Sequence, residues 1–277
     1  MLASVGESKF VDIDGINTHY VVAGEGSPVL LVHGLGASMV VWRENVADLA
    51  QRFKVYVIDL PGHGDTDKPD IEYGAESTVE YIRKFVEFLG VGKIALMGNS
   101  LGGGLVLMTA LMHPEIVSKL ALVSSGSLGR EVSIWLRLPS LPVIGEIVTN
   151  GPVDNTEFML QKAFFDKSLA TKELVAELRR TNSLPGGRKA VLKIIRNFIS
   201  LLGVKRQYVR ARDVGRLEMP ILIVWGAEDK MIPPKHAYRA ATNNSRVDLH
   251  VFSNCGHMAQ LERPSEFNRI ALEFLSK

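Results

Sequence analysis

The stretch Gly98-Asn99-Ser100-Leu101-Gly102 constrains the fold of this chain more than any other feature. An apolar run typical of a strand precedes it at 93–97, and an apolar run long enough for a buried helix follows at 103–112. A serine at such a junction is expected to occupy a strained turn, because Cβ atoms at positions 98 and 102 would collide with the neighbouring strand and helix. The turn presents the hydroxyl group beside the N–H groups of a helix N-terminus. The pattern therefore predicts a nucleophilic serine at position 100.

Apolar runs and helical patterns alternate on both sides of this turn. The strands are expected at 28–32, 53–58, 93–97, 120–123, 220–225 and 247–252, and the helices at about 39–51, 77–89, 103–112, 234–242 and 264–276. Ser77 or Thr78 is a plausible cap for the second helix. Two short runs flank Asp14-Gly15 and predict a β-hairpin. This alternation is typical of an α/β fold with a parallel sheet.

The rhythm changes between Gly126 and Asp213, where strands no longer alternate with helices. Helical patterns near 155–166, 171–182 and 187–202 lie among segments broken by proline and glycine. We interpret this part as a helical cap at 126–213, inserted into a core domain made of residues 1–125 and 214–277.

Composition and charge exclude several classes of protein. The net charge of +2 comes without a cluster of lysine and arginine, so no nucleic acid partner is expected. A single cysteine, Cys255, excludes an internal disulfide framework. The first ten residues lack a signal-peptide pattern, and no apolar run reaches the roughly 18 residues of a membrane span. We expect a soluble, cytoplasmic monomer or homodimer with no membrane partner.

Ser100 requires a base within hydrogen-bonding reach, because a serine hydroxyl is a weak nucleophile at neutral pH. Polar loops follow the strands expected at 220–225 and 247–252; the first contains Glu228 and Asp229, and the second contains His257. The order serine, acid, histidine is expected after such a turn. We predict that His257 takes the proton and that Asp229 orients the imidazole, with Glu228 as the alternative acid.

Acyl chemistry also requires donors for an oxyanion. The N–H group of Leu101 is one candidate, and the turn His33-Gly34-Leu35-Gly36 offers another from Leu35. A phosphate-binding loop is the alternative for this turn, but the chain has no G-x-G-x-x-G or Walker pattern there. His33 and His63 lie in loops at strand ends, where they are expected to tie loop backbone together.

These motifs together resemble the α/β-hydrolase superfamily over almost the whole chain. The turn at 33–36 resembles its H-G-x-G motif, residues 59–66 its D-x-P-G-x-G-x-S/T loop, and residues 98–102 its nucleophile turn. Residues 226–233 and Gly256-His257 resemble its acid and base segments, and this spacing favours Asp229 over Glu228. The resemblance implies an eight-stranded, mostly parallel sheet with helices on both faces and a cap after the sixth strand.

Within the superfamily, Asn99-Ser100 and residues 255–260 resemble the meta-cleavage-product hydrolases, which cut C–C bonds in 2-hydroxy-6-oxo-dienoates. Two positions depart from that group: Met258 stands where a tryptophan is usual, and Gly36-Ala37-Ser38 where the turn usually continues Gly-Pro-Gly. The group also uses a cap arginine to hold the dienoate carboxylate, a role open to Arg179 or Arg180.

These departures favour a carboxylesterase acting on a small-molecule ester with an apolar acyl or aryl group, with C–C hydrolysis as the alternative. A ligand-binding receptor that retains the triad is an alternative of another class. No cofactor or metal is expected, since no cluster with metal-ligand spacing is visible in the sequence. The residues expected to contact substrate are Gly34, Asn99, Trp135, Phe164 and Met258.

Overall fold

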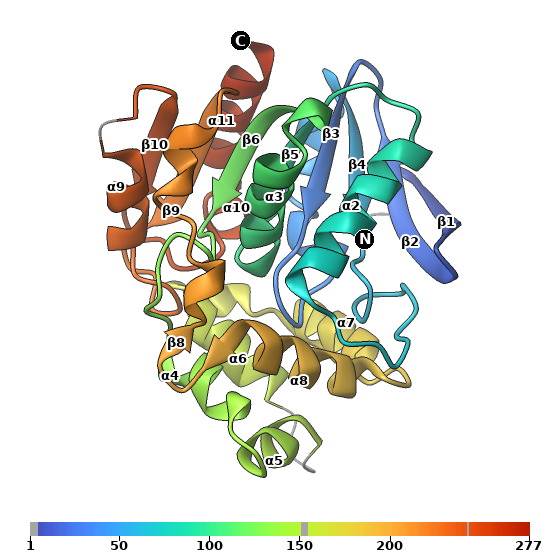
Figure 1. The fold of residues 1–277 in the computed structure, drawn as a ribbon, viewed down its shortest axis with the longest axis vertical. Coiled ribbons are helices and arrows are strands. Elements are labelled where there is room, and N and C mark those ends of the chain that lie inside the picture. The colour runs from blue at the N-terminus through green and yellow to red at the C-terminus, as the bar shows by residue number, and fades with distance from the viewer. Residues whose placement is uncertain (1–4, 151–154, 243) are drawn as a thin grey trace.

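A computed structural model describes residues 5–150, 155–242 and 244–277 (Figure 1). The main sheet has eight strands in the order β1-β2-β4-β3-β5-β6-β9-β10. Its strands are β1 (Glu7–Ile13), β2 (Ile16–Ala23), β3 (Ser27–Val32), β4 (Phe53–Ile58), β5 (Ile94–Asn99), β6 (Val117–Val123), β9 (Ile221–Gly226) and β10 (Val247–Phe252). The β1–β2 and β2–β4 pairs are antiparallel and the other pairs are parallel, which confirms the predicted α/β fold.

The first two strands form the predicted hairpin. Asp14 and Gly15 join them with φ values of 53° and 77°. Both values lie in the left-handed region, which matches the twist of a two-residue hairpin turn. The hairpin predicted from Asp14-Gly15 is therefore confirmed.

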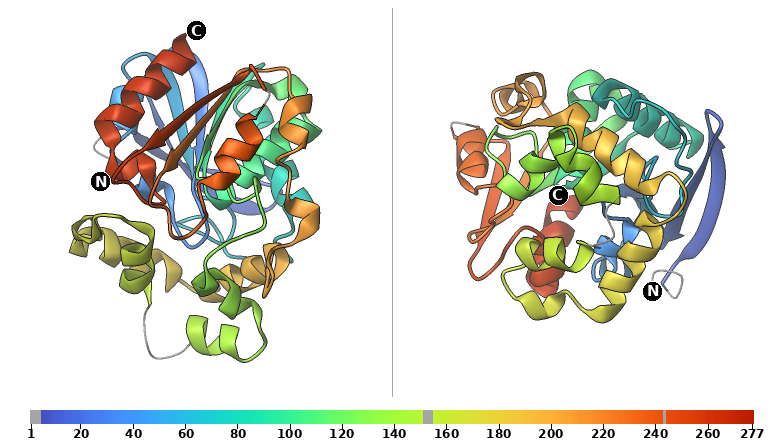
Figure 2. Two further views of the ribbon diagram at one scale, coloured as in Figure 1. Left: turned by 90° about the vertical axis from the view of Figure 1, so that its left-hand side faces the viewer. Right: turned by 90° about the horizontal axis from the view of Figure 1, so that it is seen from below.

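Helices cover both faces of the sheet and bury one hydrophobic cluster on each (Figure 2). The first cluster includes side chains of α2 (Ala75–Phe88), α3 (Leu101–Met112) and α9 (Lys235–Ala241). The second includes side chains of the 3-10 helix η2 (Met39–Trp42), α1 (Val46–Leu49), α10 (Ala259–Glu262) and α11 (Pro264–Ser276). The central strands are mostly apolar because both of their faces are covered.

Most of the chain between β6 and β9 lies beyond the carboxyl ends of the parallel strands (Figure 1). It forms α4 (Ile134–Arg137), α5 (Ile144–Asn150), α6 (Thr156–Ala163), α7 (Lys172–Asn182), α8 (Gly187–Phe198) and a small hairpin of β7 (Ile199–Ser200) and β8 (Gly203–Val204). We call this segment the cap; its division from the core at 126–213 stays a prediction. The helix expected to continue to 202 ends at Phe198, where the hairpin begins.

Two local expectations were wrong. The helix expected at 39–51 is interrupted into η2 and α1, because buried Asn45 between them donates to the Gln260 carbonyl and to Asn268 Oδ1. Helix α2 is preceded by Gly74 instead of a capping serine or threonine, and the hydroxyls of Ser77 and Thr78 both donate to the Gly74 carbonyl. Among the helices of the described residues, none is long and apolar enough to cross a membrane.

Candidate active site

Ser100 lies at the sharp turn from β5 into α3, with φ 56° and ψ −118°. Two glycines make this turn possible. A Cβ atom on Gly98 would lie 2.4 Å from the Gly102 carbonyl oxygen, and a Cβ atom on Gly102 would lie 2.4 Å from the His33 carbonyl oxygen. The crowding expected from the sequence is therefore present on the helix side and on the strand side. A strained serine of this kind is typical of sites where a hydroxyl group must be presented.

His257 and Asp229 meet at the ends of β10 and β9. The His257 Nδ1 atom lies 2.8 Å from Asp229 Oδ2, and both residues are buried. Asp229 Oδ1 accepts the N–H groups of Met231 and Ile232 at 2.8 and 2.9 Å. The carboxylate is thus fixed through both oxygens, and it can orient the ring and stabilise a charged imidazole.

The neighbouring acid has a different role. Glu228 Oε2 accepts the N–H group of Cys255 at 3.0 Å, whereas the described hydrogen bond of the His257 ring to a carboxylate goes to Asp229, so the geometry favours Asp229 as the partner of the imidazole. Cys255 itself is buried, and burial raises the pKa of its thiol well above the ordinary value. A thiol in this state is a poor nucleophile.

Asn99, expected to contact substrate, is tied to the protein. Its amide lines the central cavity but donates to the carbonyl oxygens of Val123 and His257, both at 3.3 Å. The side chain beside Ser100 therefore holds the main chain of the histidine. This link between the serine turn and the histidine loop was not expected from the sequence.

The turn after β3 lies against the serine. A Cβ atom on Gly34 would lie 3.0 Å from Ser100 Cβ, and both Leu35 and Leu101 line the cavity that contains Ser100. His33 supports this turn, because its ring contacts the Gly34 carbonyl at 2.7 Å and accepts the Leu60 N–H group at 3.0 Å. The expected role of His33 in tying loop backbone together is confirmed.

Ser100 and His257 open into a cavity of about 230 Å³ between the core and the cap. Its described lining contains no aspartate, glutamate, lysine or arginine. Of the side chains expected to contact substrate, Trp135 and Met258 line it, as does Gly34. Phe164 does not belong to this lining: it is buried in the second hydrophobic cluster, because the chain leaves α6 there and turns toward the core.

The sequence analysis missed the contribution of α8 and the chain after it. Val191, Ile194, Ile195 and Phe198 line the cavity from one face of α8, and Tyr208 follows from the 3-10 helix η6 (Arg206–Tyr208). The spacing of these apolar residues is that of a helix with one buried stripe. That stripe was a usable signal, although a face packed on the core would look the same.

A second, more polar hollow of about 80 Å³ adjoins the cavity and shares part of its lining, including Asn182 and Val191. Arg179 and Arg188 line this hollow. Arg180 lies elsewhere, since its guanidinium group holds both carboxylate oxygens of Asp65 at 2.8 and 2.7 Å. The structure therefore separates two adjacent arginines that the sequence left equivalent.

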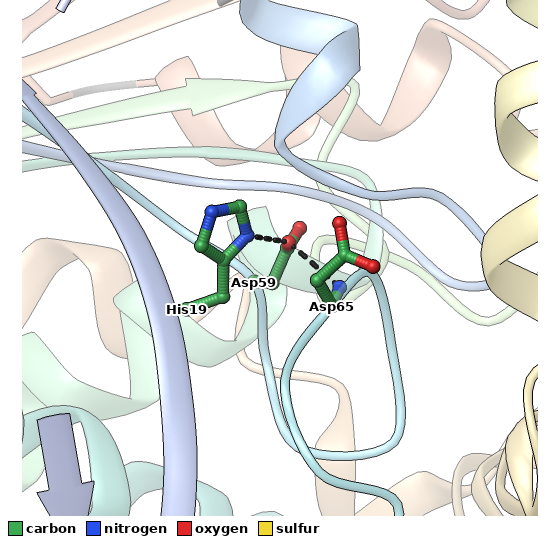
Figure 3. Close-up of side chains that lie close together, drawn as sticks. All are labelled: His19, Asp59 and Asp65. Atoms are coloured by element: carbon green, nitrogen blue, oxygen red, sulfur yellow. Dashed lines mark hydrogen bonds and ion pairs between the residues drawn. The ribbon is translucent and has the colours of Figure 1, made fainter. Parts of the chain in front are cut away.

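One cluster of potential metal ligands occurs among the described residues: His19, Asp59 and Asp65 (Figure 3). Asp59 Oδ2 lies 2.9 Å from His19 Nδ1 and accepts the Asp65 N–H group at 3.0 Å. Asp59 Oδ1 accepts the N–H group of Met39, and Arg180 occupies the Asp65 carboxylate. The cluster is thus a hydrogen-bonded junction between β2, the loop after β4 and the cap. The carboxylate oxygens of Asp59 and Asp65 already accept hydrogen bonds from protein groups.

Comparison with known proteins agrees with this geometry. Residues 29–270 match the model of the alpha/beta hydrolase family. The chain belongs to this family. A 2-hydroxy-6-oxononadienedioate/2-hydroxy-6-oxononatrienedioate hydrolase of Burkholderia vietnamiensis is 32% identical over 98% of the chain and 96% of the relative.

Two further proteins that are similar to this chain carry related names. A 2-hydroxy-6-oxo-6-(2'-aminophenyl)hexa-2,4-dienoic acid hydrolase of Metapseudomonas resinovorans is 30% identical over 97% of the chain and 91% of the relative. The solved meta-cleavage product hydrolase of Pseudomonas fluorescens superposes with a TM-score of 0.83 at 28% identity, covering 99% of this chain and 98% of that one. The protein is therefore a hydrolase with features of the meta-cleavage-product hydrolases.

Proposed function

We propose that this hydrolase cleaves the C5–C6 bond of a 2-hydroxy-6-oxo-dienoate that carries an apolar group on C6. The observation that carries the proposal is the position of Ser100 and His257 in an apolar cavity that adjoins a hollow lined by arginine. The names of the relatives support this substrate class over the ester favoured by the sequence. Met258 and the altered turn at 36–38 are then variations within a C–C hydrolase.

The proposed chemistry starts with acyl transfer to Ser100. The hydroxyl oxygen bonds to C6 while its proton passes to His257 Nε2, and the N–H groups of Leu35 and Leu101 donate hydrogen bonds to the former carbonyl oxygen, which now carries the negative charge. The substrate reacts as its keto tautomer, which has a carbonyl group at C2. When the C5–C6 bond breaks, its electron pair delocalises onto the C2 oxygen. That oxygen takes up a proton, and His257 gives up the proton that it received from Ser100, so that the imidazole is neutral again.

The acyl group that remains on Ser100 is removed by water. His257 accepts a proton from this water, which attacks the ester carbon, and returns the proton to Ser100 Oγ as the ester bond breaks. One dienoate and one water give one carboxylic acid and one 2-hydroxypentadienoate.

We assign the two ends of the substrate from the residues that line the cavity and the hollow. The cavity beside Ser100 presents Trp135, Met159 and Ile195, so it suits a phenyl or alkyl group on C6. The adjoining hollow presents Arg179 and Arg188 together with polar side chains, so it suits the C1 carboxylate. Arg180 is unsuited to this role because it does not line the hollow; its guanidinium group binds Asp65 elsewhere.

Two adjacent arginines on α7 provide a matched test. Arg179→Gln is expected to raise the KM for 2-hydroxy-6-oxo-6-phenylhexa-2,4-dienoate by at least tenfold, equivalent to about 1.4 kcal/mol of carboxylate binding. Arg180→Gln, which removes the same charge one residue further along, is expected to leave that KM within about twofold. Steady-state kinetics of both variants decides the matter, and an unchanged KM in Arg179→Gln would remove the carboxylate from this hollow.

Ester hydrolysis is the second candidate. The described lining of the cavity contains no carboxylate, ammonium or guanidinium group, so it suits an uncharged ester equally well. The same triad would form the acyl-enzyme, with an alkoxide as the leaving group. An ester of a simple alcohol has no carboxylate for Arg179. The Arg179→Gln variant is therefore expected to hydrolyse p-nitrophenyl butyrate at the rate of the unmodified protein.

A further inference from the structure

The loop that carries His257 is joined to the cap by main-chain contacts. The His257 N–H group donates to the carbonyl oxygen of Ala163, the last residue of α6, at 2.7 Å. A Cβ atom on Gly256 would lie 2.4 Å from that oxygen and 2.8 Å from the Phe165 nitrogen. The cap segment at 163–165 therefore lies directly against the histidine loop, and the closeness of the two requires glycine at position 256.

Glu262, at the end of α10, bridges the same two segments. Its Oε1 atom accepts the Gly256 N–H group at 2.8 Å, and its Oε2 atom accepts the Phe165 N–H group at 2.7 Å. The described residues include no lysine or arginine in an ion pair with this carboxylate. Burial raises the pKa of Glu262, and the bonds from Phe165 and Gly256 act in the opposite direction. Desolvation of a partly buried carboxylate costs free energy, and the two hydrogen bonds from main-chain donors offset that cost.

We propose that Glu262 is a positioning residue for the catalytic base, because it fixes the His257 loop to the cap segment at 163–165. The main chain of His257 is then held on two sides. Its N–H group bonds to the cap at Ala163, and its carbonyl group accepts the Asn99 amide from the serine turn. Glu262 secures the cap side of this arrangement one residue before the histidine. The imidazole is thereby kept between Asp229 and the cavity that contains Ser100.

The proposal rests on the proposed roles of Ser100 and His257 but is independent of the natural substrate. A fluorophosphonate reagent serves as the probe, since it bonds covalently to a serine activated by a base and needs no dienoate. The second-order rate constant of labelling, measured by mass spectrometry on the full chain, reports how well His257 is placed. Thermal unfolding of each variant is followed in parallel.

Removing one bond at a time tests the bridge. In Glu262→Gln the amide nitrogen faces a main-chain donor, so one bond is lost while the volume is kept. Phe165→Pro removes the N–H donor on the cap side, and Phe164 before it already has the extended conformation (φ −86°, ψ 143°) that suits a following proline. Both variants are expected to be labelled at least tenfold more slowly, and the double variant no slower than about the slower of the two.

Matched controls separate positioning from general stability. Glu266→Gln removes an exposed carboxylate four positions further on, and Phe165→Ala removes the ring but keeps the N–H group. Both are expected to be labelled at the unmodified rate. With the dienoate, Glu262→Gln is expected to lower kcat at least tenfold and to change KM less than twofold, unlike Arg179→Gln.

The outcomes are distinct. A Glu262→Gln variant that melts at a lower temperature but is labelled at the unmodified rate would overturn the positioning role. An unmodified protein that is labelled but does not consume the dienoate would contradict the proposed substrate and leave the labelling comparison valid. An unmodified protein that is not labelled would contradict the role of Ser100 and, with it, both proposals.

Discussion

At the residue scale, the site depends on which hydrogen-bond partner each polar side chain has. Asp229 uses one oxygen for His257 and the other for two main-chain N–H groups. Glu228, its neighbour, accepts the Cys255 N–H group. Two adjacent carboxylates thus have separate tasks, one at the imidazole and one in the loop beside it.

This division predicts unequal effects of two amide substitutions. Asp229→Asn leaves the shape intact but removes the charge and places a possible donor next to His257 Nδ1, so we expect kcat/KM to fall by about 10³–10⁴-fold. Glu228→Gln is the matched change at the adjacent position and is expected to stay within about tenfold of the unmodified protein. Initial rates on the dienoate measure both. Equal losses in the two variants would mean that the acid has been assigned to the wrong residue.

At the element scale, the turn from β5 into α3 depends on close packing against the end of β3. Gly102→Ala would place a methyl group 2.4 Å from the His33 carbonyl oxygen, whereas a Cβ atom on Gly92 meets nothing within 4 Å. Overpacking against backbone cannot be relieved by a rotamer change, so we expect Gly102→Ala to lower the free energy of unfolding by about 2–3 kcal/mol or to prevent folding. Gly92→Ala is expected to change it by less than about 1 kcal/mol. Urea unfolding followed by circular dichroism measures the difference, and equal stabilities would contradict this packing.

Local signals predicted most of the sheet and the serine turn. The strands at 28–32 and 53–58 are apolar because they are buried on both faces, and Asp14-Gly15 fits only a tight hairpin turn. The break at Asn45 had no such signal, because its partners Gln260 and Asn268 lie more than 200 positions away. Long-range contacts of this kind override local helix propensity.

The catalytic residues could be predicted for a related reason, and the substrate contacts could not. Ser100, Asp229 and His257 each follow a strand, and the carboxyl ends of parallel strands meet at one edge. No comparable rule predicts which side chains of the cap face the cavity. Phe164 and Trp135 are both aromatic residues of the cap, yet one packs into a hydrophobic core and the other lines the cavity. Which of the two aromatic residues lines the cavity depends on how the cap helices pack on the core.

At the scale of the whole molecule, buried histidines couple stability to pH. Burial lowers the pKa of His63 to about 3 and also lowers the pKa of His33. Below the ordinary histidine value of about 6.5, the unfolded chain binds protons that the folded chain does not, so the free energy of unfolding decreases as the pH falls. Acid is therefore expected to destabilise the protein well above the range in which its carboxylates titrate.

His63→Leu tests this coupling. Between about pH 7.5 and pH 5.5, the His63 proton alone is expected to cost the unmodified protein about 1.4 kcal/mol of stability, a loss that the leucine variant avoids. Urea unfolding of both proteins at the two pH values gives the difference directly. Parallel pH dependence in the two proteins would show that the folded state accommodates the charged imidazole.

The measurement that tests the central claim most directly is a paired determination of kcat/KM on one preparation, with 2-hydroxy-6-oxo-6-phenylhexa-2,4-dienoate beside p-nitrophenyl butyrate. Loss of the coloured dienoate and release of p-nitrophenolate are both followed by absorbance. We predict that the dienoate leads by tenfold or more, a transition-state preference of at least about 1.4 kcal/mol. An ester that leads by the same margin would contradict C–C hydrolysis and make this protein a carboxylesterase.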